Sequence, residues 1–147
     1  MRERETQTIE EIEVEMLPTL ADGMRLDGWR LVQILCISRD DGYELQYSFG
    51  GGYALKTLKL TFGLKDTVPS ITPYYGAAFL YENEIRDLFG ARIERIAPDW
   101  EGKVFDVADK TPFAKRSVPL TSSERPEGAL RLGGNRPTAA RSEGGLQ

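Results

Sequence analysis

The sequence predicts one α+β domain, in which a mainly antiparallel sheet of three to four strands packs on one long helix. Hydrophobic and polar residues alternate over 43–49 and 57–62, as in half-buried strands. A stripe of apolar residues at helical spacing follows over 73–89. These three segments form a compact unit if the helix lies across one face of the sheet.

The 147 residues suffice for one domain with a core, and 40% hydrophobic with 29% charged residues is typical of a soluble globular protein. A net charge of −4 argues against binding to nucleic acid or to an anionic membrane surface. The sequence contains no apolar run as long as a transmembrane helix, and its first 16 residues lack a signal-peptide core. We therefore expect a cytoplasmic protein without direct membrane insertion.

Two absences narrow the possible chemistry. The sequence has no histidine, which excludes a Ser–His–Asp triad, a Cys–His pair and any imidazole metal ligand. Its single cysteine, Cys36, excludes an intramolecular disulfide and argues against a self-contained iron–sulfur cluster. Because Cys36 lies in an apolar run, we expect a buried, inert thiol. We predict no catalytic, cofactor-binding or metal-binding residue in this chain.

The first 42 residues predict a short strand, a brief helix and a buried strand. Apolar and acidic residues alternate over 12–16, which favours a strand, and the apolar spacing over 17–24 favours a helix. The nearly continuous apolar run 31–37 predicts a central strand covered on both faces, and Asp-Asp-Gly at 40–42 predicts a hairpin turn.

Three consecutive glycines, Gly50–Gly52, stand between two predicted strands. Such a segment can cradle a phosphate when it opens a helix. Here it joins two strands, so a flexible hairpin loop is the favoured interpretation.

The predicted helix has marked ends. Thr72 can cap its N-terminus, Pro73 suits the first helical position, and Gly90 suits a left-handed C-terminal turn. One arc of the helical wheel is apolar and should face the core: Ala77, Ala78, Tyr81, Ile85, Leu88 and Phe89.

Phe79 and Leu80 fall outside that arc. Either a loop covers this bulky pair, or the helix is clamped between its own sheet and another subunit. Charged residues accompany the pair, namely Glu82, Glu84, Arg86 and Asp87. They suit interface ion pairs or a solvated face, and catalysis is the weakest interpretation. Glu82 and Arg86 have the favourable i, i+4 order for an ion pair.

After the helix, residues 91–97 predict a short strand, and 99–102 predict a turn that carries Trp100. A tryptophan in a loop anchors that loop either to its own core or to a partner. The pair Lys115-Arg116 is either solvated or contacts a carboxylate or phosphate. Composition then changes, so we predict a domain over 1–120 and a flexible C-terminal tail over 121–147 that can become ordered along a partner.

The motif Pro69-Ser-Ile-Thr72, then Ala77-Ala78, then Glu82-Asn-Glu-Ile-Arg-Asp-Leu-Phe-Gly90, resembles the signature of the 30-kDa subunit of respiratory complex I. The same module occurs in membrane-bound, energy-converting nickel–iron hydrogenases. A weaker similarity covers roughly 28–113. The resemblance implies an α+β subunit without a cofactor that packs against a large catalytic subunit.

By this resemblance, nickel–iron and iron–sulfur centres belong to partner subunits: a hydrogenase-like (49-kDa-type) large subunit and a small iron–sulfur subunit. The complex would lie on the membrane, with this chain peripheral on the cytoplasmic side. The residues expected at the partner interface are Phe79, Leu80, Glu82, Glu84, Arg86, Asp87 and Trp100.

Within this family, two departures favour the hydrogenase type. The segment after the helix motif contains no histidine, whereas the complex I version normally has one, and the chain is short. Such complexes oxidise ferredoxin, reduce protons and pump ions. The first alternative is the 30-kDa subunit of a respiratory NADH-quinone oxidoreductase, complex I itself. The second is a free-standing domain that binds a small molecule between helix and sheet.

Overall fold

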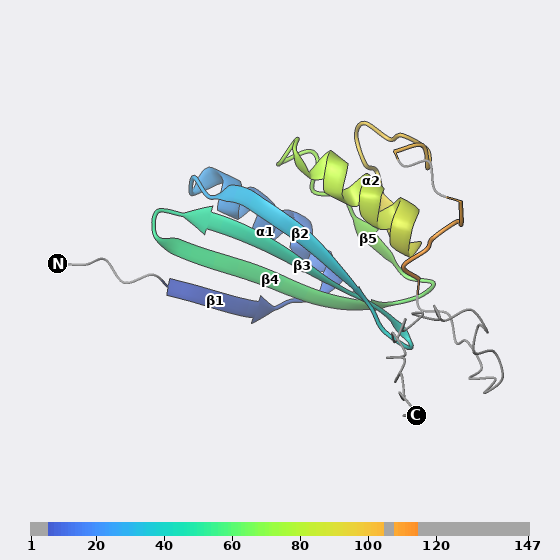
Figure 1. Cartoon of the computed structure of the whole chain (residues 1–147). Coiled ribbons are helices and arrows are strands. Elements are labelled where there is room, and N and C mark those ends of the chain that lie inside the picture. Colours follow the sequence, from blue (N-terminus) through green and yellow to red (C-terminus); the bar gives the residue numbers. More distant parts are fainter. Residues whose placement is uncertain (1–5, 105–107, 115–147) are drawn as a thin grey trace, which may run out of the picture. The chain divides into compact units, whose positions relative to one another are not determined.

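A computed structural model describes residues 6–104 and 108–114, all of which belong to one compact unit, residues 1–116. Figure 1 shows the order of its helices and strands. The predicted tail 121–147 and the pair Lys115-Arg116 lie outside the described residues.

The main sheet has four strands: β1 (Thr6–Glu11), β2 (Arg30–Ser38), β3 (Gly42–Gly51) and β4 (Ala54–Gly63). Their order across the sheet is β1-β4-β3-β2. The β2–β3 and β3–β4 pairs are antiparallel, and β1 runs parallel to β4. The predicted α+β class is confirmed, with a sheet that is mixed because of β1 (Figure 1).

The N-terminal prediction was wrong about which residues form the strand. The strand β1 ends at Glu11, and a 3-10 turn, η1 (Val14–Met16), replaces the expected strand over 12–16. The N–H of Ile12 donates to the Lys59 carbonyl at 2.8 Å, one residue beyond the end of β1. Among the described residues, this is the last backbone hydrogen bond between the N-terminal segment and β4. The turn leads directly into α1 (Leu17–Leu26), the expected brief helix, which carries a proline in its first turn, where a missing N–H costs nothing.

The apolar run 31–37 is not a central strand. It forms β2, which lies at one edge of the sheet and buries only one face, with Ile34 and Cys36 inward. Leu35 and Ile37 stay exposed on the other face. The central, most buried strand is β3, which lies between β2 and β4. An edge strand with apolar residues on both faces has the same composition as a central strand, and this explains the error.

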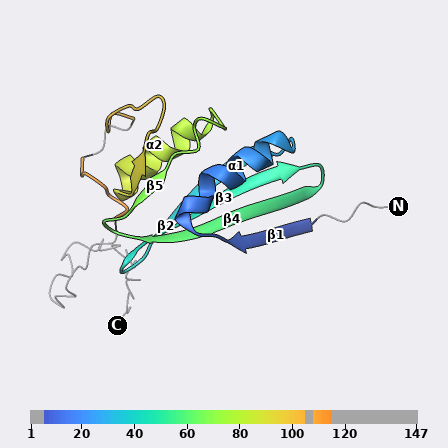
Figure 2. The same cartoon turned by 180° about the vertical axis from the view of Figure 1, so that it is seen from behind.

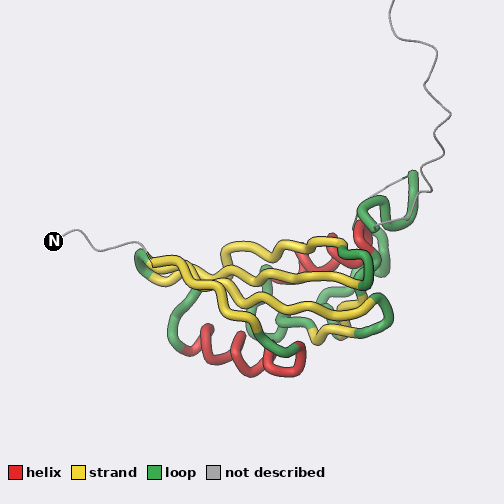
Figure 3. Tube along the Cα trace, turned by 90° about the horizontal axis from the view of Figure 1, so that it is seen from below, coloured by secondary structure: helices red, strands yellow, loops and turns green. Residues whose placement is uncertain are grey.

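Both helices contribute to one hydrophobic core on a single face of the sheet. Leu17, Ala21 and Met24 from α1 and Ala78 and Ile85 from α2 (Ala78–Phe89) join one buried cluster with strand residues. The main sheet contributes Ile34, Cys36, Tyr43, Leu45, Tyr47, Phe49, Leu58, Leu60 and Phe62. In Figure 2, α1 lies in front of the sheet, and Figure 3 shows it beside the neighbouring strands. No described helix covers the opposite face, here called the open face.

The glycine segment forms the predicted hairpin. Gly50 and Gly51 end β3, and Gly52 takes a left-handed φ of 57° in the tight turn to β4. Gly51 packs against the indole of Trp29, where a Cβ would come within 2.9 Å. Gly51 is therefore required by its close packing on Trp29, and Gly52 by the left-handed backbone of the turn.

A two-stranded parallel sheet, β5 (Thr67–Pro69) with β6 (Arg92–Glu94), flanks α2. The strand expected over 91–97 is thus confirmed as the shorter β6. Together β5 and β6 fix both ends of the segment that carries α2, because one strand precedes the helix and the other follows it.

The helix expected over 73–89 begins five residues later, at Ala78. The N–H groups of Tyr74 and Tyr75 both bond the Ile71 carbonyl, so 71–77 forms turns. Tyr75 is also anchored, since its hydroxyl donates to the Trp29 carbonyl at 2.9 Å and its ring packs on Phe49. Thr72 is not the N-cap. Gly90 does adopt the predicted left-handed turn, with φ 79°.

Candidate partner interface on helix α2

Helix α2 has a buried side that holds it on the domain. Ala78, Ile85 and Leu88 are buried, as the helical wheel predicted, whereas Ala77 is exposed and precedes the helix. Tyr81 is half-buried, and its hydroxyl donates to the Val32 carbonyl on β2 at 3.3 Å. The helix is therefore fixed to the edge of the main sheet by packing and by a direct hydrogen bond.

The outer side of α2 carries an apolar patch, which we define as Phe79, Leu80 and Trp100 and call the outer patch. Leu80 is 48% exposed and Trp100 is 45% exposed. The rings of Phe79 and Trp100 lie 6.0 Å apart in a tilted arrangement. The Trp100 loop contacts Phe79, as the first alternative expected, but Leu80 stays exposed. Contact of this pair with another subunit stays a prediction. Trp100 contacts the domain and still presents nearly half of its surface.

Asn83 holds the loop that positions Trp100. This side chain is fully buried, and its Nδ2 donates to the carbonyls of Phe79, at 2.8 Å, and Pro98, at 3.0 Å. Its Oδ1 accepts from the Trp100 N–H at 3.2 Å and from Arg86 at 2.9 Å. Sequence reasoning did not single out Asn83, because its partners lie 15 and 17 residues away in the chain.

Arg86 and Asp87 also bind the segment that follows β6. Arg86 Nη1 donates to Asp99 Oδ1 at 2.6 Å, and its Nε lies 3.5 Å from Asp87 Oδ1. Asp87 Oδ2 accepts from the Val104 N–H at 3.3 Å. The Glu101 N–H and the Arg86 guanidinium lower the pKa of Asp99. These charged side chains hold the Trp100 loop on α2. The side chain of Asp87 is only 5% exposed, which leaves little of it for a partner.

Glu82 does not lie on the outer side. It is fully buried, and its two carboxylate oxygens accept from the Ser70 hydroxyl and from the Ile71 N–H, the latter at 2.9 Å. The predicted ion pair with Arg86 is wrong, because positions 78, 82 and 85 share one face and carry Glu82 into the core. Burial raises its pKa to about 7 despite the two hydrogen bonds.

The residues before α2 complete this buried polar cluster. Ser70 and Thr72 are both buried, and their hydroxyls lie 2.7 Å apart. Thr72 Oγ1 accepts from the Ala97 N–H at 3.1 Å, which ties the segment after β5 to the segment after β6. Ser70, Thr72 and Glu82 of the Pro69–Gly90 motif thus join β5, α2 and the following loop.

Glu84 remains the one motif carboxylate with exposed surface and no ion-pair partner among residues 6–104 and 108–114. Its neighbours Arg86 and Asp87 are engaged within the domain. The predicted role of Glu84 in a partner interface stays a prediction.

Two observations bear on metal binding and on thiol reactivity. Within them, no three His, Cys, Asp or Glu side chains gather closely enough to hold a metal ion. Cys36 is buried, and burial raises the pKa of its thiol to about 12, which keeps it protonated and unreactive. No helix in the described part of the chain has the length and apolarity needed to cross a membrane.

Comparisons with known proteins bear on the family and the fold of the chain. The family model of the respiratory-chain NADH dehydrogenase, 30-kDa subunit, matches residues 3–101, which include β1, α2 and Trp100. Among solved structures, a chain of the archaeal membrane-bound sulfane sulfur reductase, a respiratory membrane complex, has a TM-score of 0.61 at 19% identity. That match covers 74% of this chain and 67% of the other. No curated protein matches the sequence.

Proposed function

Because this chain belongs to the family of the 30-kDa subunit of respiratory-chain NADH dehydrogenase, we propose that it braces the large catalytic subunit of a membrane-bound electron-transfer complex. It acts without an active site or cofactor of its own. The observation that carries this proposal is the two-sided helix α2, which is fixed inward by Ile85 and Leu88 and carries the outer patch outward.

The outer patch suits a protein partner. Tryptophan and phenylalanine supply large contact areas at low entropic cost, and such residues concentrate in the centres of interfaces. Here they are held in place before binding, because Asn83 fixes the backbone at Trp100 and the Phe79 ring supports the indole. A prearranged patch loses less conformational entropy when it binds.

The charged residues of α2 have three different roles. Arg86 and Asp87 support the patch from within the domain, since both bind the Trp100 loop. Glu84 is available for a lysine or arginine of the large subunit. Glu82 supports α2 from inside, and we assign it no direct contact with the partner.

We further propose that the complex is of the energy-converting hydrogenase type, which oxidises ferredoxin, reduces protons and pumps ions. The histidine-free segment after α2 supports this choice. The partners are then a hydrogenase-like large subunit and a small iron–sulfur subunit, which hold nickel–iron and iron–sulfur centres on the cytoplasmic side. The 30-kDa subunit of a respiratory NADH-quinone oxidoreductase is the alternative.

Affinity purification of the tagged chain from its native membranes, followed by mass spectrometry and metal analysis, tests the proposal. A hydrogenase-like large subunit with nickel and iron is the expected result. Iron and flavin without nickel, together with NADH-oxidising subunits, would assign the chain to complex I instead. Recovery of the chain alone from the soluble fraction would contradict both assignments and favour a free-standing binding domain.

A further inference from the structure

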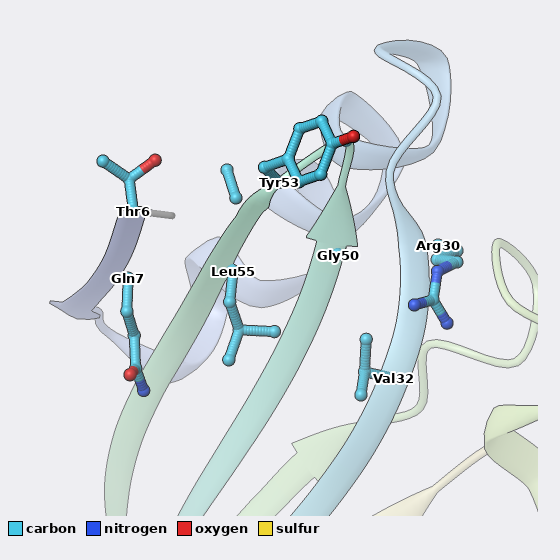
Figure 4. A pocket seen from close by; sticks show the side chains of 9 residues that line it. Thr6, Gln7, Arg30, Val32, Gly50, Tyr53 and Leu55 are labelled. Carbon is cyan, nitrogen blue, oxygen red and sulfur yellow. The ribbon is translucent and has the colours of Figure 1, made fainter. Parts of the chain in front are cut away.

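A hollow of about 530 Å³ lies where the β3–β4 hairpin meets the two outer strands (Figure 4). One residue from each strand of the sheet forms a row across it, in the order Gln7, Leu55, Gly50 and Arg30. Directly paired residues point to the same side of a sheet, and Gly50 is three residues from the core-facing Tyr47. The row therefore lies on the open face, away from both helices and from the outer patch.

The hollow combines one cation with apolar walls. Figure 4 shows the guanidinium of Arg30 and the methyl groups of Val32 on one side, with Leu55 and Gln7 on the other and Tyr53 at the end. Tyr53 is 68% exposed, and no acidic residue lines the hollow.

Arg30 differs from the other cations of the described sheet. Lys56 pairs with Glu10 at 2.8 Å, and Lys59 lies 3.7 Å from Glu11. Arg30 has no carboxylate partner among the described residues, although the chain carries a net charge of −4 and has many carboxylates. An exposed guanidinium between apolar walls matches an anionic group that is attached to an aliphatic stem.

Glycine forms the floor of the hollow. A Cβ at Gly50 would lie 3.2 Å from Val32 Cγ2 and 3.6 Å from Arg30 Nε. A side chain there would therefore occupy the space over which the guanidinium extends. Glycine within a strand costs stability relative to alanine, and here it keeps the backbone open to close approach.

We propose that this hollow is a second docking site, which takes a glutamate or aspartate side chain from an acidic, partly apolar segment of a partner protein. The carboxylate accepts hydrogen bonds from both ends of the Arg30 guanidinium, and the aliphatic stem packs on Val32 and Leu55. The proposal does not depend on the outer patch, because the two surfaces share no residue.

Titration of the full ¹⁵N-labelled chain with two synthetic peptides, at low ionic strength, tests the proposed docking site. The peptides are acetyl-Gly-Leu-Glu-Glu-Leu-Gly-amide and the same peptide with glutamine at both glutamate positions. We expect the glutamate peptide to shift the amide resonances of Arg30, Gly50 and Gly52, and to bind about three- to tenfold more tightly than the glutamine peptide. Equal binding, or shifts elsewhere only, would overturn the proposal.

Matched variants distinguish binding in the hollow from a nonspecific attraction by positive charge. Arg30→Gln should reduce binding of the glutamate peptide to the level of the glutamine peptide, and Gly50→Ala should weaken binding of both. Arg92→Gln removes an exposed arginine of β6 that does not line the hollow, and it should change neither affinity. An equal loss in the Arg92 variant, or inorganic phosphate competing as well as the glutamate peptide, would contradict a protein carboxylate as the occupant.

Discussion

The side-chain amide of Asn83 accepts a hydrogen bond from the backbone N–H of Trp100 at 3.2 Å, across 17 residues of sequence. This bond joins a buried residue of α2 to an exposed indole of the following loop. It shows that the outer patch is built from two segments and that its shape depends on a residue that no partner can touch.

Replacing Asn83 with alanine should therefore damage the patch from inside. The change leaves the Trp100 N–H and the Pro98 carbonyl without their partner, and we expect a loss of roughly 2–3 kcal/mol in the free energy of unfolding. In a Trp29→Phe background, the emission of Trp100 should also shift to the red. Glu84→Ala, one residue along, serves as the control and should leave both the stability and the emission nearly unchanged.

The buried carboxyl of Glu82 should make stability depend on pH. Its pKa is about 7 in the folded protein against 4.5 as the reference, so the folded state binds more protons between these values. The contribution of Glu82 to the free energy of unfolding is therefore greatest below about pH 4.5. As pH rises to about 7, this contribution falls by roughly 3 kcal/mol. The neighbouring Tyr47, whose pKa is raised well above 10 by burial and by Glu82, stays neutral across this window.

Urea unfolding at several pH values between about 5 and 7.5 measures the effect. Between the two pKa values, a difference of one bound proton changes the free energy of unfolding by about 1.4 kcal/mol per pH unit. Glu82→Gln should flatten the slope. Glu44 and Asp99, whose pKa values are lowered, act in the opposite direction and only below their reference values of 4.5 and 3.8. A wild-type slope that persists in the Gln variant would rule out Glu82 as its source.

A side chain at Gly90 should destabilise the end of α2. This residue has φ 79°, and a Cβ there would lie 3.0 Å from Thr111 Cγ2. We expect Gly90→Ala to cost about 1–2 kcal/mol of stability by thermal or urea unfolding. Gly76→Ala is a matched control, because nothing lies within 4 Å of its Cβ position and its φ is not positive. A similar loss at both positions would show that the backbone conformation at Gly90 is not the cause.

Much of the fold follows from local patterns in the sequence. Alternation over 43–49 and 57–62 located β3 and β4, and Gly90 marked the end of α2, because side-chain period and backbone φ are local properties. The parallel pairing of β1 with β4 and the edge position of β2 could not be predicted, since both depend on contacts between distant segments. The same holds for Tyr75, which lies in the turns before α2 and bonds the distant Trp29 carbonyl.

The candidate site was predictable only where it is exposed. Leu80 stood out as a bulky apolar residue outside the core arc, and Trp100 stood out as a tryptophan in a loop. Glu82 was predicted on the outer side of α2 because it is charged. It lies four residues after Ala78 and three before Ile85, and this spacing puts it on the buried side. Its carboxylate is satisfied by Ser70 and Ile71, and that compensation is visible only in the folded chain.

The exposed Leu80 and the buried Leu88 separate folding from assembly most directly. Leu80→Asp and Leu88→Asp are made in the tagged chain and compared, first by circular dichroism on heating and then by recovery of the large subunit from native membranes. Leu80 is 48% exposed, so its variant should keep nearly the wild-type stability yet recover much less large subunit. Leu88 is 7% exposed, so its variant should lose several kcal/mol and unfold. Equal unfolding in both variants, or full recovery of the large subunit by a folded Leu80→Asp chain, would contradict a two-sided α2 that braces a partner.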